Sequence, residues 1–193
     1  MIEREIPWQD PMLTAKTVSQ TVEHMAFLYS GMQTSYSGRY SFLATEPAAV
    51  VRATGRDLEI SWADGRSESF TDVDPLIELR GLLARFEIAE VPGLPRLRGG
   101  LVGWIGYDAV RLIEDLPDAP PGDMVLPEIA LLLVDTLVIF DNRDQKILLL
   151  THADVRDGAD LVQARAQAVA RLEELASRLE GEAPSLGGRI DAS

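Results

Sequence analysis

The stretch AAVVRATGRDLEISW, residues 48–62, decides the fold class. Its first half, Ala48 to Ala53, is an apolar and β-branched run, and its second half, Leu58 to Trp62, alternates with a period of two residues. Gly55-Arg56-Asp57 lies between the two halves and is typical of a tight turn. The stretch therefore predicts a β-hairpin, so at least part of the sheet in this protein is antiparallel.

Further strands and helices are expected on both sides of this hairpin. Apolar or alternating runs predict strands at residues 26–29, 40–44, near Phe70, 101–105, 129–134, 136–140 and 146–151. Helical spacing of apolar residues predicts helices at 12–25, from Asp74 to Phe86, and at 160–180, and the entry segment 1–12 is expected to be extended.

This order of elements predicts an α+β domain built on antiparallel sheet. We expect one domain over residues 1–180, followed at 181–193 by a linker or tail that is rich in Pro, Gly and Ser.

Composition excludes several classes of function. The net charge of −13 repels phosphate backbones and anionic lipid, so we expect no nucleic-acid partner and no membrane partner. Cysteine is absent, which excludes disulfides and thiolate metal sites, and two histidines are too few for a histidine-based metal cage. No window approaches a membrane span, and no apolar leader is visible, so a cytoplasmic protein is expected.

The residues alone specify no catalytic set. His24, on the helix expected at 12–25, and His152, just past a strand, have no partner spacing that indicates a triad. The glycine-rich run from Gly99 to Gly106 follows a proline-rich connector, so it does not fit a dinucleotide fingerprint. Glycines within a strand instead predict a bend, or a close approach of the backbone to a neighbouring element.

The segment FLYSGMQTSYSGRYSF, residues 27–42, has the composition of a ligand-binding loop. Hydroxyls, backbone amides and the lone Arg39 between Tyr36 and Tyr40 could receive a small zwitterion. The alternative is a polar hairpin loop whose arginine stacks on a tyrosine. Farther along the chain, Asp108 and Arg111 are expected to form a structural pair.

Two blocks of the sequence resemble component I of anthranilate synthase and aminodeoxychorismate synthase, which use chorismate. They are FLYSGMQTSYSGRYSFLATEP at 27–47 and RGGLVGWIGYDAVRLIEDLP at 98–117. Three positions depart from the pattern: Trp104 replaces Tyr, Asn142 replaces His, and Tyr29 replaces the Glu of feedback-inhibited anthranilate synthases. The matching positions are Phe27–Ser30, Gly38–Phe42, Pro47, Gly99, Gly100, Gly103, Gly106, Tyr107, Asp108, Arg111, Glu114, Pro117 and Ile139–Asp141.

The resemblance implies a β-sandwich-like domain with flanking helices, as in the N-terminal part of that component. It also implies a tryptophan-type pocket for an aromatic amino acid, lined by Leu28, Ser30, Arg39, Tyr40 and Ser41. Chorismate, Mg²⁺ and the acid–base chemistry are expected in a catalytic domain that this sequence lacks. The chain is thus expected to hold no catalytic residue and no cofactor. Its expected partners are that domain and a glutamine amidotransferase subunit.

Within this family, the lead-in Glu5 to Pro11 and Tyr29 favour aminodeoxychorismate synthase, which serves p-aminobenzoate and folate biosynthesis. The alternative is anthranilate synthase of tryptophan biosynthesis. A free-standing amino-acid sensor and a pure interaction domain for the glutaminase are open as well. The sequence also leaves open the oligomeric state and whether the chain is a separate subunit or a remnant.

Overall fold

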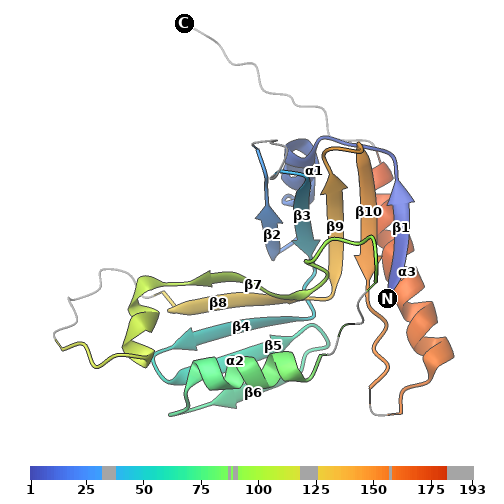
Figure 1. The fold of residues 1–193 in the computed structure, drawn as a ribbon. Helices are drawn as coiled ribbons and strands as arrows, with labels where there is room; N and C mark the ends of the chain where they lie inside the picture. The colour runs from blue at the N-terminus through green and yellow to red at the C-terminus, as the bar shows by residue number, and fades with distance from the viewer. Residues whose placement is uncertain (32–37, 87, 89–90, 118–125, 157, 182–193) are drawn as a thin grey trace, which may run out of the picture.

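The computed structural model describes residues 1–31, 38–86, 88, 91–117, 126–156 and 158–181. The described strands form two antiparallel sheets of five strands each, which confirms the α+β class (Figure 1). In spatial order, the first sheet contains β1 (Ile2–Ile6), β10 (Lys146–Thr151), β9 (Thr136–Asp141), β3 (Tyr40–Thr45) and β2 (Met25–Leu28). The second contains β6 (Ser67–Phe70), β5 (Asp57–Trp62), β4 (Ala49–Thr54), β8 (Ile129–Val134) and β7 (Gly100–Ile105).

Aspartate caps begin the three described α-helices, which are α1 (Pro11–Val18), α2 (Pro75–Ala84) and α3 (Leu161–Glu180). Asp74 accepts a hydrogen bond from the Leu76 amide at 2.9 Å, and Asp160 accepts one from the Val162 amide at 2.9 Å. These bonds satisfy backbone donors that the first helical turn leaves free. A short 3₁₀ helix, η1 (Tyr107–Leu112), follows β7.

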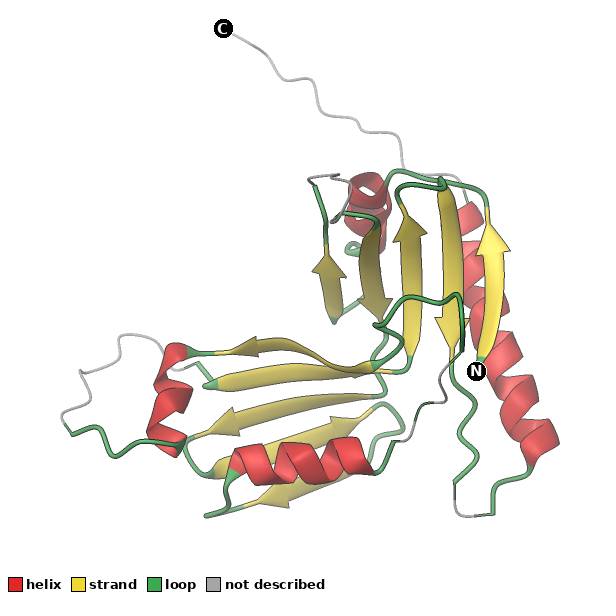
Figure 2. Ribbon diagram, in the orientation of Figure 1, coloured by secondary structure: helices red, strands yellow, loops and turns green. Residues whose placement is uncertain are grey.

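The two sheets lie as the arms of an L, with α3 along the first sheet and α2 along the second (Figure 2). One apolar cluster packs the first sheet against α1 and α3, and another packs the second sheet against α2 and η1. A third cluster joins the sheets and includes Val134, Leu137 and Ile139. Only part of each sheet faces the other, so the sandwich-like arrangement is open.

The N-terminal expectations need two corrections. The segment expected to be merely extended contains β1, which pairs with β10 so that Ile2 lies opposite Thr151. The helix expected at 12–25 ends at Val18, so His24 lies in the connection before β2 and not on a helix. Hydroxyls of Ser19 and Thr21 donate to the carbonyls of Lys16 and Val18, and such bonds compete with further helical turns. Among the described residues, no helix is long and apolar enough to cross a membrane.

The glycines at the start of the second block allow β7 to approach β8, as the sequence predicts. A Cβ added at Gly103 would lie 2.9 Å from the Cα of Leu131 and closer still to the carbonyl oxygen of Ala130. A Cβ added at Gly99 would lie 2.9 Å from the carbonyl oxygen of Val134. Backbone atoms cannot move aside as the end of a flexible side chain can, so these two positions exclude larger residues.

We expect Gly103→Ala to lower the free energy of unfolding by about 3 kcal/mol, because the new methyl group forces β7 away from β8. Gly81→Ala is the matched control. Gly81 lies within α2, and its added Cβ meets nothing within 4 Å, so this change should raise stability by about 1 kcal/mol. Urea unfolding measures both effects. Equal stability of the two variants would contradict the close approach.

Candidate functional site

The polar end of the first sheet, where β2, β3 and the β9–β10 turn meet, brings together residues from distant parts of the sequence. Ser41 is fully buried at the start of β3, and its hydroxyl oxygen accepts a hydrogen bond from the Ser30 amide at 3.1 Å. The same oxygen accepts a second bond from Nδ2 of Asn142 at 3.2 Å. A hydroxyl has two lone pairs, so one buried serine links three chain segments.

Asn142 connects the β9–β10 turn to the segment before β3. Its buried side chain donates from Nδ2 to the Gly38 carbonyl at 3.0 Å, and its backbone amide donates to the Arg39 carbonyl at 2.7 Å. Its own carbonyl accepts from Nε2 of Gln145 at 2.9 Å. The sequence marked Asn142 only as a departure from the family pattern, and its place beside Gly38, 104 positions away, was not evident from local pattern.

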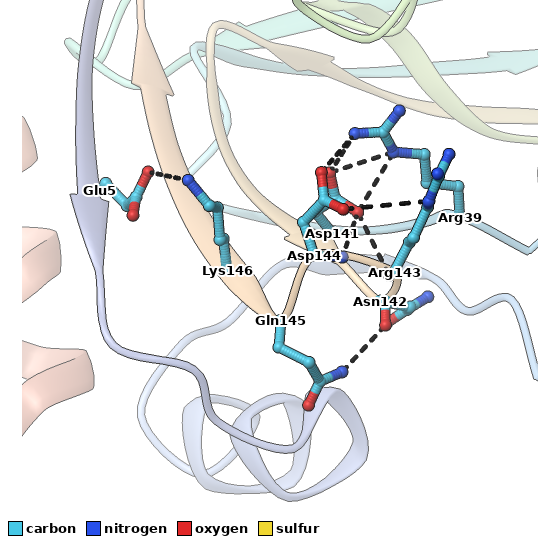
Figure 3. Close-up of polar contacts among 8 residues, drawn as sticks. All are labelled: Glu5, Arg39, Asp141, Asn142, Arg143, Asp144, Gln145 and Lys146. Carbon is cyan, nitrogen blue, oxygen red and sulfur yellow. Dashed lines mark hydrogen bonds and ion pairs between the residues drawn. The ribbon is translucent and has the colours of Figure 1, made fainter.

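Arg39 turns toward two carboxylates (Figure 3). Its Nη2 donates to Oδ2 of Asp141 at 2.7 Å and to Oδ2 of Asp144 at 2.9 Å, and Nε also donates to Asp141. The guanidinium carbon lies 4.9 Å from the centroid of the Tyr40 ring, so the stacking alternative is present as well.

The charges of this cluster shift the pKa values of its members. The hydrogen bond to Asp141 raises the pKa of Arg39. Burial works to raise the pKa of Asp141, but bonds from Arg39 and from the amides of Asp144 and Arg143 outweigh it and hold that pKa below its ordinary value. Burial, followed by the charge of Asp141, raises the pKa of Tyr40. Arg39 and Asp141 therefore form an ionised salt bridge at neutral pH, and the Tyr40 phenol beside them stays neutral.

The five residues of the expected amino-acid pocket fall into two groups. Ser30 and Ser41 are hydrogen-bonded to each other, whereas Arg39 and Tyr40 are stacked and face Asp141. Tyr40 packs on the cluster between the sheets, and because successive side chains of a strand alternate, Ser41 lies on the opposite face. Leu28 is opposite Phe42 in the register and shares the face of Tyr40.

A pocket that uses all five residues therefore stays a prediction. Residues 32–37 of the loop, Tyr36 included, lie outside the described residues. Two surface hollows of about 370 and 290 Å³ are present elsewhere, and none of the five residues lines either one. The larger lies among the α1–β2 connection, the β3–β4 connection and the end of β5, and the smaller lies between α1 and α3.

The second sequence block forms β7 and η1. Arg111 donates from Nη1 to the Leu116 carbonyl at 2.6 Å, and its Nε lies 3.5 Å from Asp108, so the expected Asp–Arg pair is present but long. Ala109 is buried against the second sheet, while Tyr107 is exposed. Over the part of the chain that the structure describes, no group of three or more His, Asp or Glu side chains is arranged to hold a metal ion.

Comparison with known proteins finds similarity to one group of enzymes. The chain matches no model of a known protein family. It is 40% identical over 144 residues to anthranilate synthase component 1 of Pseudomonas aeruginosa, a match that covers 74% of this chain and 28% of that protein. It is 42% identical over 127 residues to the protein of the same name from Streptomyces coelicolor, covering 64% of this chain and 24% of that protein.

A solved structure of a protein with the same name is similar to this chain in fold. Anthranilate synthase component I from Streptococcus pneumoniae matches with a TM-score of 0.54 and 24% identity, over 75% of this chain and 31% of that chain. The chain thus spans 24% to 31% of the length of these relatives.

We expect Asn142→Ala to lower the free energy of unfolding by about 2 kcal/mol, because it leaves the Gly38 carbonyl and the Ser41 hydroxyl without their shared donor. Arg143→Ala is the matched control in the same turn. The Arg143 side chain is exposed, so its removal should change stability by less than about 0.5 kcal/mol. If urea unfolding gives the same loss for both variants, Asn142 does not hold the turn to β3.

Asp141→Asn should give a stability difference that depends on pH. The folded pKa of Asp141 is lowered, so its contribution is complete above the unfolded value of about 3.9 and is lost as the pH falls through the folded value. The variant should be about 1 kcal/mol less stable than the parent at pH 6, and the difference should shrink at pH 3. Urea unfolding at both pH values is the measurement. A difference that does not change with pH would contradict the ionised pair.

Proposed function

Because this chain is homologous to part of anthranilate synthase component 1, we propose that it serves as the non-catalytic N-terminal part of a chorismate-using aminating synthase. The sequence identity of 40% over 144 residues carries this proposal. The antiparallel α+β fold supports it, and so do the two sequence blocks, which form structured parts of both sheets.

The anthranilate branch is favoured over the aminodeoxychorismate branch that the lead-in and Tyr29 suggested. The relatives compared above carry the name anthranilate synthase component 1. Tyr29 by itself favours the aminodeoxychorismate branch, because it brings no carboxylate to this position. Its exposed ring stacks on Phe27, with the two ring centroids 5.6 Å apart. Tryptophan inhibition through a glutamate at this position is therefore not proposed.

The chemistry of the synthase is assigned to polypeptide that this chain does not contain. Mg²⁺ prefers carboxylate oxygens arranged around it, and the described residues offer no such cluster. In this proposal, no catalytic step involves the described residues. Chorismate, Mg²⁺ and the amine supplied by a glutamine amidotransferase belong, in this proposal, to the catalytic part and its partner subunit.

The polar end of the first sheet is proposed as half of a pocket for an aromatic amino acid. The Ser30 hydroxyl and the backbone around Ser30 would receive the charged end of the ligand, with Leu28, Arg39, Tyr40 and Ser41 nearby. In support of this, Ser41 and Asn142 fix both ends of the intervening loop. The other half of the pocket would come from the catalytic part, so a regulatory or structural amino acid would be shared between the two.

The purified chain is expected to convert no chorismate, with either ammonia or glutamine. Supplying the Pseudomonas aeruginosa component 1 polypeptide without its matched segment should restore formation of an aminated product above the level of that polypeptide alone. Mass spectrometry measures the aminated product, whose identity is set by the catalytic polypeptide supplied. Product from this chain alone would contradict the non-catalytic assignment, as would the absence of any restoration.

Calorimetry with tryptophan should detect weak binding or none to the chain alone. Loss of even two charge-assisted hydrogen bonds, at roughly 1.5 to 3 kcal/mol each, weakens affinity about a hundredfold or more. Addition of the complementary polypeptide should recover binding, and Ser30→Ala should reduce it again. Tight binding to the isolated chain would instead support a free-standing amino-acid sensor.

A further inference from the structure

Arg98, in the segment that leads into β7, lacks the partners that the other half-buried arginines have. In the part of the chain that the structure describes, the half-buried arginines are Arg4, Arg98 and Arg111. Arg4 pairs with two glutamates of α3, and Arg111 donates to the Leu116 carbonyl and lies beside Asp108. The side chain of Arg98 makes no hydrogen bond and no ion pair with any described residue.

The guanidinium group of Arg98 has a buried side and an open side. Its Nε is shielded from solvent and donates to no acceptor, whereas the two Nη atoms are not shielded and reach the surface. A buried donor without an acceptor destabilises a fold, and so does a partly desolvated charge without a counter-charge. An ion bound at the open side is one way in which a native protein compensates such a group.

A second arginine adds positive charge at the same place. The Arg98 carbonyl oxygen lies 2.5 Å from Nε2 of His152, and Nη2 of Arg171 donates to the His152 carbonyl at 2.6 Å. The His152 amide donates to the carbonyl of Asp135, where β8 passes into β9. Arg98 and Arg171 are thus both attached to one residue at the junction of the two sheets.

The carboxylates at this junction do not neutralise its arginines. Asp135 lies 3.9 Å from Arg171, which is longer than a hydrogen bond, and its other oxygen accepts from the Thr136 hydroxyl. Hydrogen bonds from Arg156 occupy Asp154 and lower the pKa of that carboxyl to about 2. The junction is therefore locally positive, although the whole chain carries a net charge of −13.

We propose that the Nη groups of Arg98 bind a small free oxyanion, either a carboxylate or a phosphate, at the junction of the two sheets. Two N–H donors on one edge of a guanidinium match two oxygens of such an anion, so the contact is bidentate. The anion supplies the counter-charge that the described residues do not, which a water molecule cannot do. Arg171 makes the local potential more positive and favours the bound anion further.

The first test removes the charge of Arg98. Arg98→Met keeps an apolar stem but no guanidinium, so in a buffer without oxyanions it should unfold at a temperature about 2 to 4 °C above that of the parent chain. Arg96→Met is the matched control, since Arg96 is exposed in the same segment, and its Tm should change by less than about 1 °C. A Tm of Arg98→Met below that of the parent would show that the fold already satisfies this arginine and would overturn the proposal.

The second test detects the anion itself. The Nε–Hε signal of Arg98 is observable by heteronuclear NMR because Nε is shielded from solvent, and its absence from Arg98→Met assigns it. Sodium acetate and sodium phosphate are titrated separately, and sodium chloride keeps the ionic strength constant. Two charge-assisted hydrogen bonds correspond to a dissociation constant of about 1 mM, so the signal should shift to saturation within about 10 mM, in the parent and in Arg96→Met alike.

The two salts distinguish the two kinds of anion. A saturating shift with one salt alone supports the site and identifies its ligand as a carboxylate or a phosphate, and a shift with both supports a site that takes either. The bound anion should also raise the Tm of the parent chain but not that of Arg98→Met. If neither salt gives a saturating shift, or if the rise in Tm is equal for Arg98→Met and the parent, the proposal is wrong while the proposed function stands.

Discussion

The chain passes from the second sheet to the first through Asp135 alone, which lies between the end of β8 at Val134 and the start of β9 at Thr136. So short a passage fixes the two sheets to each other, and polar contacts hold it in place. The Asp135 carbonyl accepts from the His152 amide at 3.2 Å, and the hydroxyls of Thr136 and Thr151 lie 2.8 Å apart in the core. Arg171 of α3 donates to the His152 carbonyl at 2.6 Å, which ties the long helix to the same junction.

The positions of the two sequence blocks follow from this junction. β9 lies beside β3 in the first sheet, so the turn after β9 meets the GRYSF segment and forms the cluster of Arg39, Ser41, Asp141 and Asn142. β8 lies beside β7 in the second sheet, and Gly103 allows the two backbones to approach closely. The blocks are therefore placed at two different edges, one in each arm of the L, and both edges border the inner angle.

Local features of the fold were accessible from the sequence, and non-local ones were not. The hairpin at 48–62, the Asp74 cap and the helix at 160–180 depend on neighbouring residues, and the structure contains all three. The pairing of β1 with β10 depends on residues far apart in the chain. The early end of α1 is an exception, because it is a local feature that the apolar spacing missed: hydroxyl bonds between residues three positions apart compete with the helix. Composition could not reveal that the carboxylates facing Arg39 lie 102 and 105 positions away. For the same reason, the role of Asn142 and the division of the expected pocket into two groups needed the structure.

Hydrogen exchange of the backbone amides, with and without the complementary part of a component 1 polypeptide, tests most directly whether this chain is one part of such an enzyme. Amides on the surface that binds the complementary part become protected from exchange. The account predicts that the complementary polypeptide slows the exchange of part of the described amides. Exchange that is the same with and without that polypeptide would contradict it.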